Sequence, residues 1–297
     1  MYNKKIIDTS TSKNIMRLVV QGPAIHLHHL MQIHHLSKAV HGAQFIQIAE
    51  HAYFLSNVNI PSEEVKAFCA EHFIDCAYVP DQQLLKNIKL AVMDMDSTLI
   101  NIECIDEIAD MYDLKPQVAA ITESAMRGEI EFKQSLTQRV ALLKGLDQAA
   151  LKKVIDERLA FNPGAKTWID VCKANNIKTM LVSGGFTIFA DHVQKTLGLD
   201  YAKSNTLEII DGQLTGKVLG DIVDADAKAN FLKQECEALG ISVDQAIAIG
   251  DGANDLNMMN IAGIGIAYHA KPIVQQQATY AINFVGLDGI ANLFRTN

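Results

Sequence analysis

Leu-Ala-Val-Met-Asp-Met-Asp-Ser-Thr-Leu-Ile, residues 90–100, is an apolar run that stops at two carboxylates, Asp94 and Asp96, with one residue between them. Two acids at the end of an apolar strand are unfavourable, because desolvating a carboxylate costs free energy unless a cation or hydrogen bonds compensate. The carboxyl end of a buried parallel strand is, however, where α/β proteins bind their ligands. A divalent cation and an anionic substrate would make this pair of acids favourable.

The same pattern, an apolar run followed by a polar cluster, recurs twice further along the chain. Residues 178–182 precede Ser183-Gly184-Gly185, and residues 245–249 precede the segment Gly250-Asp251-Gly252-Ala253-Asn254-Asp255. Between them, Asp226-Ala227-Lys228 begins a predicted helix that runs to about Leu239. Parallel strands joined by right-handed helical crossovers all end at one edge of their sheet. The sequence therefore predicts that these distant segments meet in one crevice.

Size and charge narrow the class of protein. A chain of 297 residues has enough length for two or three folding units, and its net charge of −8 makes nucleic acid or an anionic membrane an unfavourable partner. No apolar run approaches the length of a membrane span, and the N-terminus lacks the apolar core of a signal peptide. The 5 cysteines show no metal-clip or redox spacing, so we expect most of them to be buried, in a protein of a reducing compartment, the cytoplasm.

Residues 15–80 are predicted to form a separate α+β unit. In chain order we expect a strand at Ile15–Val20, a helix to about Val40, strands at Ala43–Ala49 and His51–Val58, a helix from Pro61 to about His72 and a strand at Phe73–Val79. This β-α-β-β-α-β order is typical of a small ferredoxin-like sandwich. The predicted domain boundaries are therefore 1–86 for this unit and 87–297 for the remainder.

Histidines concentrate in the N-terminal unit, at His26, His28, His29, His34, His35, His41 and His51. His-rich tracts can bind metal. No carboxylate or cysteine completes a cage there, so a polar, partly exposed helix is the favoured interpretation.

The remainder is predicted to be α/β, with a Rossmann-like parallel sheet core. From Cys104 to about Leu159 only helical patterns occur, broken at Asp113–Pro116, Arg127-Gly128 and Lys144-Gly145, so we expect a helical cap at about 103–160 over the crevice. Further expected elements are a hairpin of Thr206–Ile210 and Gln213–Val218 around Asp211-Gly212, strands at Ile264–Ala267 and Tyr280–Phe284, and a last helix after Asp288.

The full set of motifs resembles that of the haloacid-dehalogenase-like phosphohydrolases. That family carries Asp-x-Asp-x-Thr on the first strand, Ser or Thr on the second, then Lys, then Gly-Asp-x-x-x-Asp. Here these read Asp94-Met95-Asp96-Ser97-Thr98, Ser183, Lys228 and Gly250 to Asp255. More narrowly, the segment Asp94–Leu99, Glu103, the Phe132…Arg139 segment and Ser183–Phe186 are similar to the phosphoserine phosphatases, over roughly residues 88–285.

The resemblance implies a role for each motif residue. Asp94 would attack phosphorus and carry the phosphoryl group, and Asp96 would act as general acid and then base. Mg²⁺, which prefers oxygen ligands, would be held by Asp94, Asp251 and the backbone carbonyl of Asp96. Lys228 and Ser183 would hold phosphate oxygens with help from the Gly184 amide. Thr98 and Asp255 would lie behind these residues and hold their side chains in place.

Substrate choice would lie in the cap. A free amino acid presents an ammonium and a carboxylate, which call for an acid and a base. Glu103 would meet the ammonium, and Arg139 would clamp the carboxylate in bidentate fashion. Phe132 would exclude water, and Asn254 would add a hydrogen bond.

The implied reaction is hydrolysis of O-phosphoserine to serine and phosphate, the last step of serine synthesis. The alternative is a phosphotransferase that passes the phosphoryl group to another hydroxyl compound, such as homoserine. The N-terminal unit resembles the amino-acid-binding ACT type, which implies a regulatory role through an amino-acid effector or through pairing of two copies of the chain.

Overall fold

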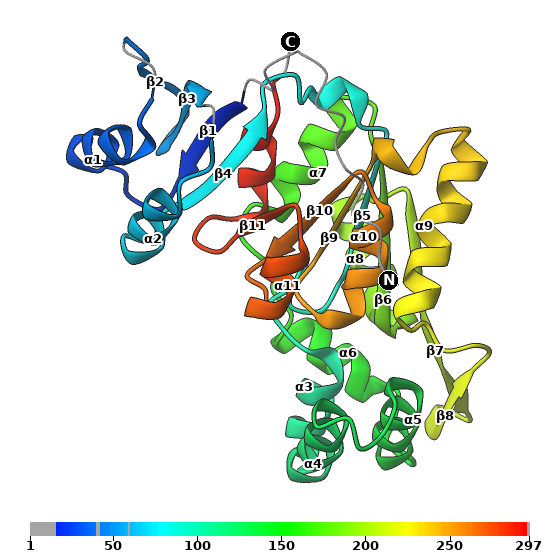
Figure 1. Cartoon of the computed structure of the whole chain (residues 1–297). Coiled ribbons are helices and arrows are strands. Elements are labelled where there is room, and N and C mark those ends of the chain that lie inside the picture. Colours follow the sequence, from blue (N-terminus) through cyan, green and yellow to red (C-terminus); the bar gives the residue numbers. More distant parts are fainter. Residues whose placement is uncertain (1–15, 40–41, 59, 296–297) are drawn as a thin grey trace. The chain divides into compact units, whose positions relative to one another are not determined.

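The computed structural model describes residues 16–39, 42–58 and 60–295 and divides the chain into two compact units. The first unit comprises the chain up to Leu84 together with the segment that begins at Asn292, and the second comprises Leu85–Ala291 (Figure 1). In the described part of the chain, no helix combines the length and apolar character needed to cross a membrane.

The N-terminal unit has the predicted β-α-β-β-α-β order. Its elements are β1 (Met16–Gln21), α1 (Leu27–Ser37), β2 (Phe45–Ala49), β3 (Ala52–Val58), α2 (Glu63–Glu71) and β4 (Asp75–Pro80). The strands form an antiparallel sheet in the order β2-β3-β1-β4. Leu18 and Leu55 of the sheet pack with Ile33 of α1 and Val65 of α2, which fixes both helices on one face. The predicted limits Ile15 and Val40 lie outside the described residues.

The C-terminal segment belongs to this first unit, which the sequence did not indicate. Arg295 forms an isolated parallel bridge with Leu84, and its guanidinium lies 2.5 Å from Asp81 Oδ1. The buried Arg17 of β1 donates a hydrogen bond of 2.9 Å to the carbonyl oxygen of Leu293. The end of the chain therefore completes the unit that the first 84 residues begin.

His26 and His28 lie against His29, which is buried in α1. Its ring centroid lies 4.0 Å from that of His28 and 5.2 Å from that of His72 in α2. Burial, followed by the charges of the neighbouring histidines, lowers the pKa of His29, so the neutral ring is favoured. His41 lies outside the described residues.

The second unit is built on a mainly parallel sheet, as predicted. Its described strands are β5 (Leu90–Met93), β6 (Lys178–Phe186), β7 (Tyr201–Ile210), β8 (Gln213–Leu219), β9 (Ala246–Gly250), β10 (Ile264–Tyr268) and β11 (Tyr280–Ile282), in the order β11-β10-β9-β5-β6-β7-β8. All neighbours are parallel except β7 and β8. The strand that carries Asp94 thus lies between the two halves of the sheet, at the switch point where such folds bind ligands.

Helices cover this sheet on both faces. Leu90 and Val92 of β5 share a core cluster with Leu232 of α9 (Ala225–Leu239) and Met258 of α10 (Leu256–Ile261), which α11 (Pro272–Gln277) extends. The other face is covered by α7 (Ala165–Ala174) and α8 (Thr187–Leu197), which contact β6. Two expectations need correction: the strand predicted to Phe284 ends at Ile282, and the last helix is a 3-10 segment, Leu287–Leu293.

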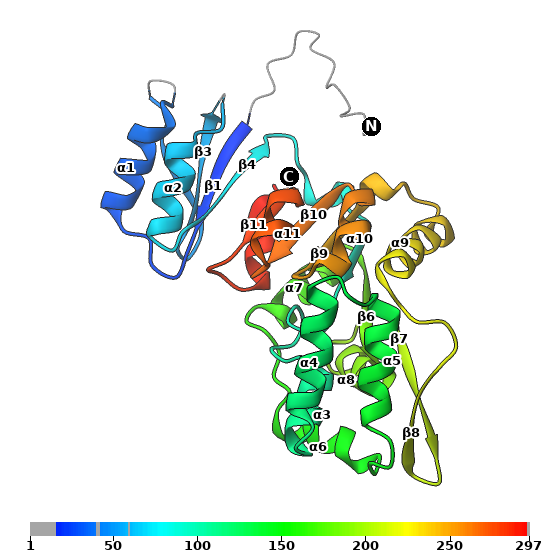
Figure 2. The same cartoon turned by 60° about the horizontal axis from the view of Figure 1, so that its bottom comes forward.

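The predicted cap is built from helices joined by short loops. It consists of α3 (Cys104–Met111), α4 (Lys115–Met126), α5 (Phe132–Leu142) and α6 (Ala149–Glu157). Pro116 lies in the first turn of α4, and the interhelical Gly128 and Gly145 have φ values of +75° and +86° that favour glycine. Figures 1 and 2 show these helices gathered at one end of the sheet, with the β7–β8 hairpin beside α5.

The hairpin has the turn that its sequence predicts. Asp211 and Gly212 have φ values of +50° and +79°, as the two central residues of a type I′ turn require. The turn is bonded to the cap, because the Gln148 amide donates to the carbonyl oxygen of Gly212 at 2.8 Å.

Candidate active site

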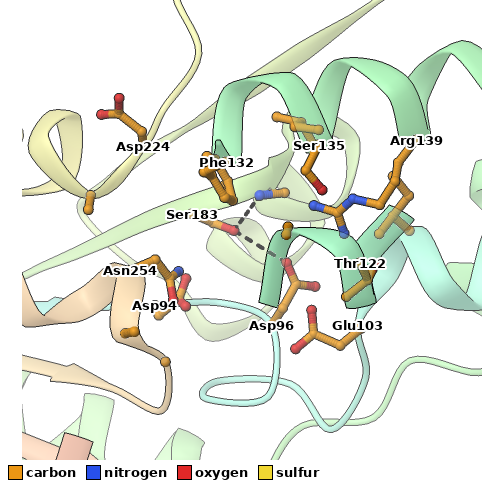
Figure 3. Close-up of a pocket in the computed structure, with 18 of the residues that line it drawn as sticks. Asp94, Asp96, Glu103, Thr122, Phe132, Ser135, Arg139, Ser183, Asp224 and Asn254 are labelled. Carbon is orange, nitrogen blue, oxygen red and sulfur yellow. Dashed lines mark hydrogen bonds between the residues drawn. The ribbon is translucent and has the colours of Figure 1, made fainter. Parts of the chain in front are cut away.

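A pocket of about 990 Å³ lies where the cap meets the ends of β5, β6 and β9. Figure 3 shows Asp94 and Asn254 on one side of it, Glu103 and Arg139 on the other, and Asp96 and Ser183 between them. Its lining includes the predicted Asp94, Asp96, Glu103, Phe132, Arg139, Ser183, Gly184, Asp251 and Asn254. The remaining three predicted residues, Thr98, Lys228 and Asp255, are buried beneath this surface.

A buried ammonium lies between two carboxylates at the floor of the pocket. Lys228 Nζ is 2.7 Å from Asp94 Oδ1 and 2.7 Å from Asp255 Oδ1, and its side chain is 1% exposed. Burial alone would lower the pKa of Lys228, but Asp255 and Asp94 outweigh it and raise that pKa above its ordinary value. The lysine is therefore held as a cation, able to balance negative charge at Asp94.

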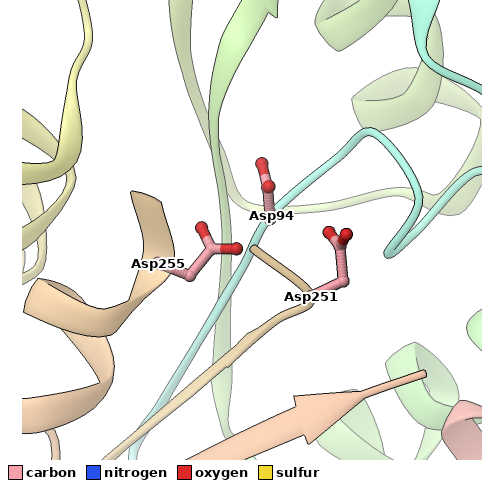
Figure 4. Close-up of side chains that lie close together, drawn as sticks. All are labelled: Asp94, Asp251 and Asp255. Atoms are coloured by element: carbon pink, nitrogen blue, oxygen red, sulfur yellow. The ribbon is translucent and has the colours of Figure 1, made fainter. Parts of the chain in front are cut away.

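Three carboxylates can share one cation. In the described part of the chain, Asp94, Asp251 and Asp255 form the group of potential metal ligands whose oxygens lie within 4.8 Å of one another, and Figure 4 shows the three side chains close together. Burial, followed by the neighbouring acids, raises the pKa of Asp251 and of Asp255 to about 7. The repulsion among these neighbouring carboxylates is relieved when a divalent cation binds to them.

Hydrogen bonds distinguish the three acids. Asp255 has both oxygens engaged, by Lys228 and by the Gly252 amide at 3.0 Å. Among the described residues, Asp251 receives only the Thr98 hydroxyl, at 3.2 Å on Oδ1, and Asp94 is likewise engaged through Oδ1. Asp94 and Asp251 thus each keep an oxygen for a cation, and Asp255 is placed to hold Lys228. An oxygen-only donor set of this kind suits Mg²⁺.

Asp96 lies between the cap and β6. Its Oδ1 accepts a hydrogen bond of 3.0 Å from the Cys104 amide, and the Ser183 hydroxyl lies 3.4 Å from Oδ2. Burial, with repulsion from Glu103, raises the pKa of Asp96 to about 7. A carboxyl group with this pKa can both donate and accept a proton near neutral pH.

The cap side of the pocket carries opposite charges. Arg139, on α5, has a buried Nε with no hydrogen-bond partner, and it forms no ion pair with the described residues. Glu103 receives the Ser97 hydroxyl at 2.7 Å, and burial raises its pKa. An unpaired guanidinium beside a carboxylate fits a ligand that brings both an anion and a cation.

Sequence reasoning missed several residues of the pocket. Asp106, in the first turn of α3, lines it three residues after Glu103, which directly precedes that helix. Gly185 approaches Asp96 so closely that an added Cβ would lie 2.7 Å from Oδ2. Lys133 and Asp224 form an ion pair of 2.9 Å at the rim, which no local pattern indicates.

Known proteins share this architecture. Residues 91–260 match the family model of the haloacid dehalogenase-like hydrolases. A phosphoserine phosphatase of Polaromonas is 54% identical over 221 residues, covering 73% of this chain and 93% of that protein. The crystal structure of a probable phosphoserine phosphatase from Vibrio cholerae is similar with a TM-score of 0.82 and 36% identity, covering 96% of this chain and 88% of that one.

A second solved structure, described as the phospho-aspartyl intermediate analogue of phosphoserine phosphatase, has a TM-score of 0.66 and 40% identity, covering 70% of this chain and 99% of that one. The family match over residues 91–260 includes the cap helices and the segments that carry Asp94, Ser183 and Asp251. This chain belongs to the haloacid dehalogenase-like hydrolases and, within them, to the phosphoserine phosphatase family.

Proposed function

We propose that this protein is a Mg²⁺-dependent phosphatase that hydrolyses O-phosphoserine to serine and phosphate, as the last step of serine synthesis in the cytoplasm. One observation carries the proposal. Asp94 and Asp251 line the same pocket as Glu103 and Arg139, and Lys228 lies 2.7 Å from Asp94 beneath its surface. The pocket therefore offers groups for a phosphate and groups for the ammonium and carboxylate of an amino acid. The names of the relatives support the same substrate.

The chain's own groups account for the chemistry. A carboxylate oxygen of Asp94 attacks phosphorus, the bond from phosphorus to the serine oxygen breaks, and Asp96 gives that oxygen its proton. Asp96 then takes a proton from water, which attacks the aspartyl-phosphate and frees Asp94 and phosphate. When bound by Asp94, Asp251 and the Asp96 carbonyl, Mg²⁺ would reduce the repulsion between phosphate and Asp94. The likeness to a phospho-aspartyl analogue structure supports the covalent step.

The remaining residues hold the substrate. Ser183, the Gly184 amide and Lys228 bind phosphate oxygens, while Asp255 keeps Lys228 in place. On the cap side, Arg139 binds the carboxylate and Glu103 the ammonium, with Asn254 adding a hydrogen bond. Phe132, 37% exposed on the pocket rim, shields the reacting atoms from water.

Arg139→Ala should separate substrate recognition from phosphoryl transfer. Loss of a buried charge pair weakens binding by roughly 2–5 kcal/mol, so kcat/KM for phosphoserine should fall by at least about thirtyfold. Hydrolysis of p-nitrophenyl phosphate, which has no amino-acid end, should change little. Phosphate release from both esters, with Mg²⁺ and with a chelator, measures this. Equal losses on the two esters, or activity that survives chelation, would contradict the proposal.

Gly185→Ala should damage catalysis without a matching loss of stability. The added Cβ would meet Asp96 Oδ2 at 2.7 Å and Met95 Cε at 2.8 Å, which displaces the proton-transferring carboxylate. We expect kcat to fall by about ten- to a hundredfold. The control is Gly240→Ala, at the end of α9, where φ is +67° and an added Cβ would lie more than 4 Å from the described residues other than its chain neighbours and the backbone of α9. It should lower the melting temperature and leave kcat unchanged.

The phosphotransferase alternative has no observation in its favour, and the relatives' names favour hydrolysis. For the N-terminal unit, predicted at 1–86 and joined in the structure by the segment from Asn292, we propose an ACT-like regulatory module. The remainder of the predicted domain 87–297, with its cap at about 103–160, is proposed as the catalytic domain. The edge strand β2 of the N-terminal unit exposes Ile46 and Ile48 by 53% and 39%, which supports pairing of two copies, and an amino-acid effector is the second proposed role. Sedimentation equilibrium with and without serine tests both.

A further inference from the structure

The two ends of cap helix α5 are held in different ways. At its C-terminal end, backbone hydrogen bonds of 2.8 Å join Gly145 to Leu214 and Leu214 to Leu146 of the following loop. Gly216 of β8 lies so close that an added Cβ would be 3.2 Å from Ala141 Cα. These contacts fix the far end of α5 to the hairpin, away from the pocket.

The N-terminal end of α5, at the pocket, is held by side chains. Lys133 Nζ lies 2.9 Å from Asp224 Oδ2 in the loop before α9. Asp224 also caps α9, because its Oδ1 accepts the Ala227 amide at 2.8 Å. One turn further, α9 carries Lys228, which contacts Asp94. A single aspartate therefore links the cap to the helix that supplies the buried lysine.

Phe132, the residue before Lys133, is the aromatic wall of the pocket. A Cβ added to Gly184 would lie 3.1 Å from Phe132 Cζ and 3.5 Å from the Val223 carbonyl oxygen, so the ring rests against the Gly184 backbone. Figure 3 shows Phe132 above Ser183, with Asp224 on the same side of the pocket. The ion pair and the aromatic contact thus close one stretch of the rim together.

We propose that the Lys133–Asp224 ion pair positions Phe132 over Gly184 and holds the cap closed on the pocket. Both are positioning residues, and their effect on catalysis rests on the proposed function. The side chains are 58% and 22% exposed, so water and salt weaken the pair. A weak pair suits a cap that must open in every cycle to release product.

Lys133→Met keeps the apolar stem, and Asp224→Asn keeps a side chain that can cap α9. Each should lower the closed fraction and raise KM for phosphoserine roughly two- to fivefold, with kcat unchanged or higher. Because the two residues act through one contact, the double variant should be no worse than either single variant. Lys152→Met, which removes the exposed Lys152–Asp156 pair within α6, is the matched control and should leave KM unchanged.

Amide hydrogen exchange without substrate tests the same idea independently of turnover. Protection of the α5 amides should fall in both single variants and in the double variant, and should stay at the parent level in the control. If the parent does not hydrolyse phosphoserine, the proposed function fails while the exchange result still decides the ion pair. The inference would be overturned if the losses in the two single variants were additive, or if α5 protection stayed unchanged. It would also be overturned if Lys133→Met had an effect and Asp224→Asn had none, because Lys133 would then contact the substrate directly.

Discussion

Asp94→Asn is expected to lower kcat for phosphoserine by at least about a thousandfold while the protein stays folded. An amide is nearly the size of the carboxylate but is a poor nucleophile, so the proposed aspartyl-phosphate cannot form. Lys228 keeps Asp255 as a partner at 2.7 Å, which limits the loss of stability. Steady-state phosphate release gives kcat, and thermal unfolding verifies the fold.

A covalent readout sharpens this test. Acid-quenched parent enzyme mixed with phosphoserine should gain the mass of one phosphoryl group on the peptide that contains Asp94, and the variant should not. The control is Asp170→Asn, an exposed acid of α7 whose partner is Lys166, and it should match the parent in both assays. Substantial turnover by Asp94→Asn, or a phosphoryl group on a different residue of the parent, would rule out the proposed nucleophile.

The sequence was sufficient to predict the features that depend on local pattern. The strand before Asp94 is a continuous apolar run, and a run buried on both faces is typical of a parallel sheet. Chain chirality then brings Ser183 and Asp251 to the same edge as Asp94, without knowledge of any side-chain contact. The helical cap and the Asp211-Gly212 turn follow from equally local signals.

Features set by long-range contacts could not be predicted. Lys133 and Asp224 are far apart in the chain, and each alone resembles an ordinary solvated residue, so their ion pair needs coordinates. Gly185 has a role because Asp96 Oδ2 approaches it, which composition does not record. The segment from Asn292 was expected to be the end of the catalytic domain, yet hydrogen bonds such as that from Arg17 to Leu293 place it in the first unit.

Lys228→Met is expected to lower the free energy of unfolding by about 3–5 kcal/mol and to abolish measurable turnover. The ammonium is 1% exposed and contacts both Asp94 and Asp255, so its removal leaves two carboxylates close together with no cation between them. Methionine fills most of the lysine's volume, which makes lost charge, rather than a cavity, the main cause. Denaturant titration with chelator present measures the stability of the metal-free protein.

The pH dependence of this loss separates electrostatics from packing. Asp255 already has a folded-state pKa of about 7, raised by burial and Asp94 and lowered by Lys228, so the variant should raise it further. Above the ordinary carboxyl pKa and below the raised one, the folded state binds more protons than the unfolded state, so stability increases as pH falls. The difference in free energy of unfolding between the parent and Lys228→Met should therefore be largest near about pH 8 and should shrink toward about pH 5. Lys233→Met, on the exposed side of α9, should show no deficit at either pH. A deficit of Lys228→Met that stays constant between these values would mean that packing, not charge, gives this lysine its importance.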